Sequence, residues 1–182
     1  MKIIVCMLAA FFFLDDTFAR DLPADELTVV PSVDLQKYSG TWYELARLPN
    51  RFQNDCIGDV SATYTLDSDE FIVVNRCRKE NGEITEAKGR ARRSSEAEPN
   101  SKLKVRFAPA FLSFLPFVWG NYWIIDLAPD YSYAVVGEPK REYLWILART
   151  KTLDDVMMKE ILGRVKAMGY DVKNLLFTKQ SL

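Results

Sequence analysis

From residue 40 onward, apolar and polar residues alternate with the period of two that is typical of half-buried β-strands. The clearest case is the segment 60–66, in which every even position is apolar and every odd position is polar. Similar alternation, or a run rich in β-branched and aromatic residues, recurs seven times. The pattern therefore predicts eight strands, at residues 41–46, 60–66, 71–77, 84–91, 102–107, 122–127, 133–136 and 143–149.

The connections between these strands are mostly short. Residues 67–70 form a polar turn, and Asn81-Gly82 is a strong hairpin signal because both residues tolerate positive φ. Short connections favour antiparallel neighbours along the chain. We therefore expect an all-β fold, a closed eight-stranded up-and-down barrel. A β-sandwich is the alternative, and the absence of long crossover segments argues against it.

After residue 150 the period changes to that of a helix. Thr152 is a suitable N-cap, Asp154 and Asp155 fall in the first turn, and Gly169 is a suitable C′ residue. This predicts one amphipathic helix of about four turns, packed on the outside of the barrel, followed by a short strand at 175–178. The apolar stripe consists of Leu153, Met157, Ile161, Val165 and Met168.

Composition narrows the chemistry. The 182 residues include 24 Lys and Arg, 25 Asp and Glu, and no histidine. The lack of histidine excludes Ser-His-Asp and Cys-His catalysis and His-ligated zinc, and the nearly balanced charge argues against nucleic acid as the main partner. We expect no metal and no cofactor, and a binding protein rather than an enzyme. An enzyme that uses a free, inward-facing cysteine is the alternative.

The N-terminus has the features of a secretory signal. Residues 3–14 are entirely apolar but too few to span a bilayer, and Thr17-Phe18-Ala19 fits a cleavage site. We therefore expect a signal peptide at 1–19 and one mature domain at 20–182. A short membrane anchor or a misassigned start is the alternative. Only three apolar residues precede Cys6, so the sequence as written does not support a lipid anchor.

The mature chain retains two cysteines, Cys56 and Cys77. A pair of cysteines in an exported protein indicates a disulfide. Both fall on one face of the hairpin formed by 60–66 and 71–77, but strict register places Cys56 opposite Asn81. A direct disulfide therefore requires a bulge or a register slip, and two free thiols remain the alternative.

Three short motifs carry a family resemblance. They are Gly40-Thr41-Trp42-Tyr43 in the first strand, Asp126-Leu127-Ala128-Pro129-Asp130-Tyr131 between the sixth and seventh strands, and Leu144-Trp145-Ile146-Leu147-Ala148-Arg149-Thr150 in the eighth. Together with residues 43–52 and 120–123, they make the chain from about Val33 onward resemble the lipocalins. The similarity is greatest to the bacterial outer-membrane lipocalins and their relatives, which include apolipoprotein D.

The resemblance implies a calycin barrel with one closed end. In the family, a tryptophan plugs that end and an arginine of the last strand lies across its ring; Trp42 and Arg149 match these two residues. The glycine of the first motif, here Gly40, bends the backbone into the strand, and the pair matched by Asp130 and Tyr131 lies beside the same end. The sequence departs from the family in two ways. Bacterial relatives usually carry a lipoprotein cysteine, and this sequence shows no convincing one. Animal relatives carry a disulfide partner near the C-terminus, whereas the mature chain here has no third cysteine.

Alternation within the strands indicates which side chains face the barrel interior, where an acyl chain with a polar head group would bind. The alternative is that these side chains only fill a core. Glu44 has the same parity as Trp42, and a paired structural acid is its favoured role. The proposed ligand-binding residues are Ala62, Tyr64, Val73, Asn75, Leu103, Val105, Tyr122, Ile124, Tyr143, Trp145 and Leu147.

The segment 107–119 contains no charged residue and has prolines at 109 and 116, which argue against a long helix or strand. It joins the fifth and sixth strands, so if Trp42 marks the closed end this loop lies at the open end. It can fold inward as a lid, dock on a membrane, or form a homodimer. The residues proposed for the entrance or for membrane docking are Phe111, Leu112, Phe114, Leu115 and Phe117.

A basic cluster follows on neighbouring strands, at Arg90, Arg92, Arg93, Lys102, Lys104 and Arg106. It is expected to lie on the outward face, solvated or in contact with anionic lipid head groups.

The resemblance implies a carrier that stores or transports a small lipid, a fatty acid or a lysophospholipid, for maintenance of the cell envelope. Its expected location is the periplasm or the periphery of the outer membrane. The alternatives are a protein-interaction module that uses the 107–119 loop and a lipocalin that converts a small molecule.

Overall fold

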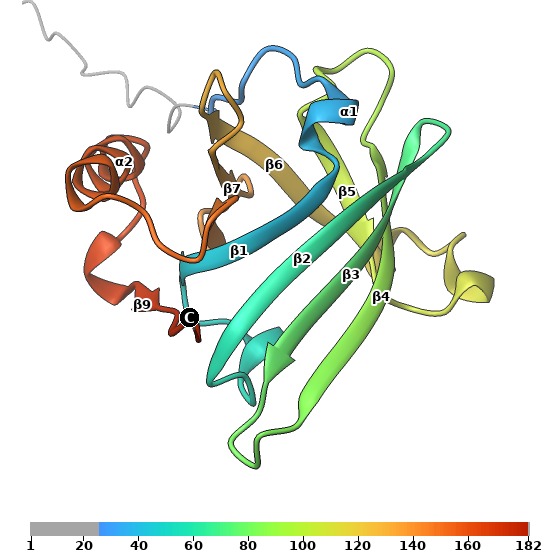
Figure 1. Ribbon diagram of the computed structural model, residues 1–182. Helices are drawn as coiled ribbons and strands as arrows, with labels where there is room; N and C mark the ends of the chain where they lie inside the picture. Colours follow the sequence, from blue (N-terminus) through green and yellow to red (C-terminus); the bar gives the residue numbers. More distant parts are fainter. Residues whose placement is uncertain (1–25, 182) are drawn as a thin grey trace, which may run out of the picture.

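The computed structural model describes residues 26–181, so the predicted signal peptide lies outside the described residues. Its strands wind into a barrel with α2 (Asp155–Ala167) on the outside (Figure 1). The strands are β1 (Gly40–Arg47), β2 (Gly58–Asp67), β3 (Glu70–Arg78), β4 (Ile84–Arg93), β5 (Lys102–Arg106), β6 (Gly120–Leu127), β7 (Tyr133–Gly137), β8 (Leu144–Ala148) and β9 (Leu176–Phe177).

The topology is the predicted up-and-down barrel. Strands β1 to β7 each pair antiparallel with the next strand in the chain, and β8 pairs with β1, which closes the sheet. Only the first half of β1, from Gly40 to Tyr43, pairs with β2. Near its C-terminal end β1 pairs with β9 instead, through Ala46 and Arg47. All eight expected strands are present. The fifth ends at Arg106 instead of Phe107, and the eighth leaves out Tyr143 and Arg149.

Both predicted turns are present, and one is tighter than expected. Asp67 and Glu70 pair directly, so the β2–β3 turn has two residues, with Ser68 at φ 58°. The Asn81-Gly82 hairpin is confirmed, with Gly82 at φ 83°. A positive φ strongly favours glycine or a small polar residue at such positions.

The helices required two corrections. The N-cap of α2 is Asp154, not Thr152, because the Asp154 carboxylate accepts hydrogen bonds from the backbone N–H groups of Val156 and Met157. Four of the five predicted apolar residues pack on the core, at Leu153, Ile161, Val165 and Met168, but Met157 is exposed and Met158 takes its place. A short helix, α1 (Leu35–Tyr38), was not predicted because one helical turn is too short for periodicity to reveal.

Two apolar layers stabilise the fold. One lies between the sheet and α2, where Ile161 and Val165 pack on the outward side chains of β1, β6, β7 and β8. The other fills the barrel interior on the side of α1, around Trp42, Tyr64 and Phe71. Because β7 is covered on both faces, all five of its residues are buried and its sequence shows no polar alternation.

None of the helices in residues 26–181 is long and apolar enough to cross a membrane. The remaining short elements are single 3₁₀ turns, namely η1 (Arg51–Gln53), η2 (Ala110–Leu112), η3 (Pro116–Val118) and η4 (Val172–Asn174).

One end of the barrel is closed by α1 and by Arg149. The Arg149 guanidinium carbon lies 3.8 Å from the centre of the Trp42 ring, which is completely buried. The same guanidinium donates hydrogen bonds to the carbonyls of Lys37, Tyr38, Ser39 and Thr41. Asp34 caps α1, and its backbone N–H donates to the Tyr131 hydroxyl. The expected plug at this end is therefore present.

Replacing Arg149 with alanine removes the contact with the indole ring and leaves carbonyls at the end of α1 without their donor. We expect a loss of about 2–3 kcal/mol in the free energy of unfolding, measured by chemical denaturation. Lys159→Ala on the exposed face of α2 is the control and should change stability little. A loss as small as that of the control would contradict the role given to Arg149.

The C-terminal tail completes the wall where β1 and β2 separate. The side-chain amide of Gln180 donates to the carbonyls of both Glu44 and Val60. Asp59, at the β2 bulge with φ 51°, accepts hydrogen bonds from Ser181 and forms an ion pair with Arg78 at 2.6 Å. The Ser181 backbone N–H and Arg78 lower the pKa of the Asp59 carboxyl from 3.8 to about 2.

A carboxyl whose folded-state pKa is lowered stabilises the fold above its unfolded pKa and loses that contribution as the pH falls. The stability difference between the wild type and Asp59→Asn should therefore be constant above about pH 4 and disappear between 3.8 and about 2. Asparagine accepts positive φ, so the bulge is retained. Denaturation at a series of pH values measures the difference. A difference that does not change over this range would refute the role of Asp59.

Candidate functional site

The open end of the barrel, called the mouth here, lies opposite the Trp42 plug. Strand β1 runs from the plug to Arg47, and the following strands alternate in direction. The mouth is therefore surrounded by the connections at 48–57, 79–83, 107–119 and 138–143. This places the 107–119 loop at the open end, as expected.

The inward side chains become accessible toward the mouth. On four strands, the inward residue nearer the mouth is partly exposed, whereas the next inward residue toward the plug is buried. The half of the barrel nearer the mouth is called the upper half here, although it is drawn at the bottom of Figure 1. Solvent therefore reaches the upper half and stops at a floor in the middle of the barrel. The pairs, with the accessible residue first, are Ala62 and Tyr64 on β2, Asn75 and Val73 on β3, Val105 and Leu103 on β5, and Trp145 and Leu147 on β8.

Three tyrosines form the centre of this floor. The Tyr122 hydroxyl lies 2.8 Å from that of Tyr38 and 2.7 Å from that of Tyr64, and all three rings are buried. Burial raises the pKa of each phenol, to about 12 for Tyr64. The hydroxyls therefore stay neutral at physiological pH and satisfy one another inside an apolar layer.

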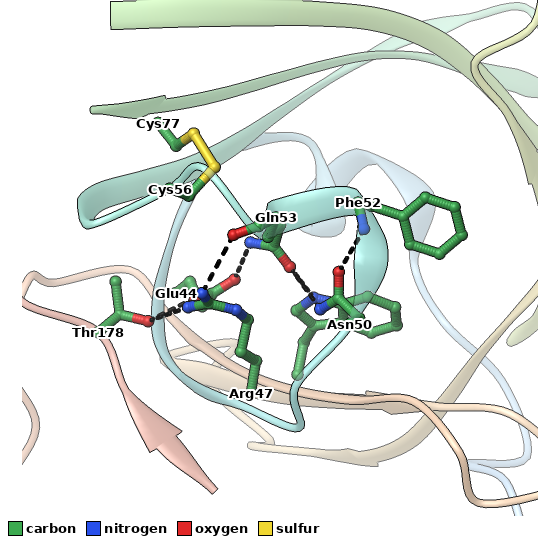
Figure 2. The surroundings of a disulfide bond; sticks show 9 residues. Glu44, Arg47, Asn50, Phe52, Gln53, Cys56, Cys77 and Thr178 are labelled. Carbon is green, nitrogen blue, oxygen red and sulfur yellow. Dashed lines mark hydrogen bonds and ion pairs between the residues drawn. A yellow bond between two sulfur atoms is a disulfide. The ribbon is translucent and has the colours of Figure 1, made fainter. Parts of the chain in front are cut away.

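Above the floor, the side chains of the mouth form a buried polar network (Figure 2). The Glu44 carboxylate, 2% exposed, accepts hydrogen bonds from Arg47 at 2.9 Å and from Gln53 at 2.6 Å, and also from Thr178. The Gln53 amide oxygen accepts in turn from Trp145 Nε1 at 2.8 Å. Glu44 is thus the paired acid that was expected, and the pair adds no net charge to the mouth.

The loop that carries Gln53 is held in place by the disulfide. Cys56 and Cys77 are bonded, with their Cα atoms 5.6 Å apart, and the Cys56 N–H donates to the Gln53 carbonyl. The required slip occurs at a β-bulge between Gly58 and Ser61. Asn50 caps η1 through a hydrogen bond to the N–H of Phe52, and its amide donates to Gln53 (Figure 2).

Aromatic rings form one side of the rim. Tyr143 stacks on Trp145 with ring centres 6.0 Å apart, and Phe52 contacts Tyr143 at 5.7 Å while remaining 64% exposed. Tyr143 precedes β8, so it lies at the rim rather than inside the wall. Phe107 lies against Gly89 of β4, where a Cβ atom would come within 2.7 Å of its ring.

The structure brings nearly all of the proposed ligand-binding residues to the barrel interior. Asn75 stands out because its buried Oδ1 has no hydrogen-bond partner among residues 26–181. Several further residues point inward but were not predicted, although those on β3 and β4 have the same alternation phase as the predicted residues. They are Leu66, Phe71, Ala91, Ala134 and Val136.

The 107–119 loop stands away from the barrel wall, on the side opposite α2 in Figure 1. Phe111, Phe114 and Phe117 are 73%, 76% and 82% exposed, so these rings do not fold inward as a lid. Leu112 and Leu115 are partly buried, so of the five residues proposed for the entrance or for membrane docking the three phenylalanines are the exposed ones.

Two hollows lie outside the upper half of the barrel. One of about 530 Å³ lies at the rim, between the 48–57 loop and the β3–β4 hairpin, and is lined by Asn54, Asp55, Ile57, Lys79, Glu80 and Asn81. The other, of about 330 Å³, opens at the plugged end beside Leu35 and Phe71. The charged, open lining of the rim hollow is less suited to an acyl chain than the apolar interior.

Neutralising the Glu44 side chain tests the mouth network. Glu44→Gln leaves the Arg47 charge buried without its partner, so we expect a loss of about 3–5 kcal/mol in unfolding free energy. The double variant Glu44→Leu, Arg47→Met removes both charges and should be more stable than Glu44→Gln. Chemical denaturation of the two proteins decides, and a double variant less stable than the single one contradicts a buried, mutually compensating pair.

Comparisons with known proteins agree with this architecture. A family model described as a lipocalin-like domain matches residues 33–180. The chain is 39% identical to temperature-induced lipocalin-1 of Arabidopsis thaliana over 157 residues, covering 86% of this chain and 84% of that protein. It is 35% identical to the outer membrane lipoprotein Blc of Escherichia coli K12 over 170 residues, covering 92% and 91%.

Solved structures show the same fold. A structure of insecticyanin from the tobacco hornworm Manduca sexta superposes with a TM-score of 0.65 at 21% sequence identity, covering 86% of this chain and 85% of that one.

Proposed function

The chain belongs to the lipocalin family, and from that premise we propose that its barrel binds one small lipid. The proposed ligand is a fatty acid or a lysophospholipid, with its acyl chain in the upper half of the barrel and its polar head at the mouth. The protein would store or transport this lipid for maintenance of the cell envelope.

The proposal rests on one observation: on four strands of the barrel, the inward side chains are partly exposed near the mouth and buried toward the plug. Ala62, Val105 and Trp145 keep accessible surface inside the wall, while their neighbours toward the plug are buried. We infer from this difference in exposure an apolar space that opens toward the mouth, which would suit an acyl chain. Each buried methylene contributes about 0.8 kcal/mol before ordering costs, so a modest chain suffices for micromolar affinity.

The mouth is polar but has no net charge from the Glu44–Arg47 pair, so it suits a polar head group of either sign or of none. Glu44 and Arg47 compensate each other, and Gln53 and Trp145 are already hydrogen-bonded to the network. A fatty acid carboxylate would therefore lie at the rim, in contact with water, and a zwitterionic head group would find no uncompensated charge. The chemistry is compatible with both proposed ligands.

We propose binding rather than catalysis. Both cysteines of the described chain are used in the disulfide, so neither provides a nucleophilic thiol. Within residues 26–181 no group of His, Cys, Asp or Glu side chains is arranged to hold a metal ion.

We also propose that the protein acts in the envelope after export, in the periplasm or at the periphery of the outer membrane. The relatives named Blc are outer membrane lipoproteins, which supports this location. Contact of the 107–119 loop with a membrane would allow lipid to move between the bilayer and the mouth. The exposed rings of Phe111, Phe114 and Phe117 support such contact, and a homodimer through the same rings is the alternative.

The direct experiment is native mass spectrometry of protein purified from the compartment where it is made, with organic extraction of the ligand. We expect about one fatty acid or lysophospholipid per chain. Apo protein that forms no adduct with added lysophospholipid or fatty acid, and whose tryptophan fluorescence does not change, would rule the carrier function out.

A substitution that fills the barrel tests the position of the ligand. Ala62→Trp places a large ring in the accessible upper half, so we expect the affinity for a fatty acid to fall by at least tenfold. Thr65→Trp adds the same ring to the outer face of the same strand and serves as the matched control. Titration followed by native mass spectrometry measures both. Equal affinities for the two variants would place the ligand outside the barrel.

A further inference from the structure

We propose that the outer face of β4 and β5, together with the 107–119 loop, forms a docking surface for membranes that carry anionic lipid. The basic face is defined here by the outward side chains of Arg92, Lys104 and Arg106. The proposal rests on the membrane contact proposed above and names the kind of bilayer that this contact selects.

The basic face contains like charges at adjacent positions. Arg92 lies directly opposite Lys104 across the β4–β5 pair, and Arg90 lies opposite Arg106. Directly opposed like charges destabilise a sheet. Arg90 is neutralised by Asp67 at 3.0 Å and Glu70 at 3.2 Å, which raises the pKa of its guanidinium.

The three cations of the basic face itself are not neutralised in this way. Within residues 26–181, Arg92, Lys104 and Arg106 make no ion pair with a carboxylate. Glu98, the acidic group that interacts electrostatically with Lys104, is hydrogen-bonded to Lys102 instead. The positive charge of the basic face is therefore left largely uncompensated.

The two arginines of the basic face are held in position by an indole ring. The guanidinium carbons of Arg92 and Arg106 lie 4.1 Å and 5.2 Å from the centre of the Trp119 ring. Arg106 is 7% exposed, and its buried Nε has no hydrogen-bond partner among residues 26–181. Arg92 is exposed, so stacking on the indole ring leaves the N–H edges of its guanidinium free to donate to phosphate oxygens. The buried Arg106 contributes its positive charge and holds the start of the loop.

The same tryptophan connects the basic face to the exposed rings. Trp119 Nε1 donates to the carbonyl of Ser113 at 2.9 Å, in the middle of the 107–119 loop, and Arg106 donates to the carbonyl of Ala108 at its start. The loop is therefore fixed beside the basic face, with Phe111, Phe114 and Phe117 pointing into solvent. An apolar tip next to uncompensated cations matches an anionic bilayer, which offers acyl chains beneath negative head groups.

Charge complementarity favours an anionic membrane over a second copy of the chain. A symmetric dimer through this surface would bury the same patch of both copies. The cations of the two basic faces would then repel each other or remain without counter-charges, which disfavours the dimer. At an anionic membrane the exposed phenylalanine rings can enter the acyl region while the basic face contacts the negative head groups. The loop at the mouth is then next to the bilayer that supplies the lipid.

Vesicle flotation tests the proposal with the full mature chain. One set of vesicles is phosphatidylcholine alone, and in the other about a third of the lipid is phosphatidylglycerol. We expect the wild type to bind the anionic vesicles at least tenfold more strongly and to lose this preference as salt is raised. The double variant Arg92→Gln, Lys104→Gln should bind the anionic vesicles roughly thirtyfold more weakly, and Phe114→Ser should weaken binding to both kinds of vesicle.

The matched control is Lys159→Gln, Lys166→Gln, which removes two exposed charges from α2 and should bind like the wild type. Replacing Arg92 and Lys104 removes their mutual repulsion but also removes the stacking of Arg92 on Trp119, so the unfolding temperature should change little. Equal binding to neutral and anionic vesicles, or an anionic preference that survives in the Arg92, Lys104 variant, overturns the proposal. So does salt-sensitive binding of a soluble acidic polymer with no binding to vesicles.

Fatty acid binding in solution is measured on the same proteins and separates the two proposals. If the vesicles show no anionic preference but fatty acid still binds, only the docking surface is wrong. If fatty acid does not bind to the wild type, the carrier function itself fails.

Discussion

The stacking of Arg149 on Trp42 fixes the closed end on which the other parts of the barrel depend. The guanidinium covers the buried indole ring and at the same time holds four carbonyls of α1 and the start of β1. Next to this plug, Tyr38 is fully buried and joins Tyr122 and Tyr64 in the tyrosine floor. Because this floor lies between the plug and the upper half of the barrel, a ligand in the upper half would be reached from the mouth.

The open end is built differently, from polar and covalent restraints. The disulfide positions the loop that carries Gln53, and Gln53 joins Glu44 of β1 to Trp145 of β8. The C-terminal tail closes the gap between β1 and β2 through Gln180. Such restraints hold the mouth in shape without filling it with apolar side chains, so the upper half of the interior remains accessible.

Much of this architecture follows from local sequence rules. Alternation revealed the eight strands, the phase of Ala62 and Tyr64 indicated the interior, and the parity of Cys56 and Cys77 indicated a disulfide that needed a bulge. The N-cap predicted for α2 was wrong because Thr152 and Asp154 both suit a cap, and the carboxylate of Asp154 accepts from the N–H groups of Val156 and Met157. The links made by Gln53 and Gln180 could not be predicted, because they join residues up to 136 positions apart.

The central claim is that a lipid lies in the upper half of the barrel with its tail toward the tyrosine floor and its head at the mouth. Paramagnetic broadening of side-chain NMR signals by spin-labelled fatty acids tests it most directly. A nitroxide at the far end of the chain should broaden the signals of Tyr64 and Leu103, and a nitroxide beside the carboxylate should broaden the indole N–H of Trp145. If both labels broaden only signals of the outer surface and leave these inward residues unaffected, the barrel is not the binding site.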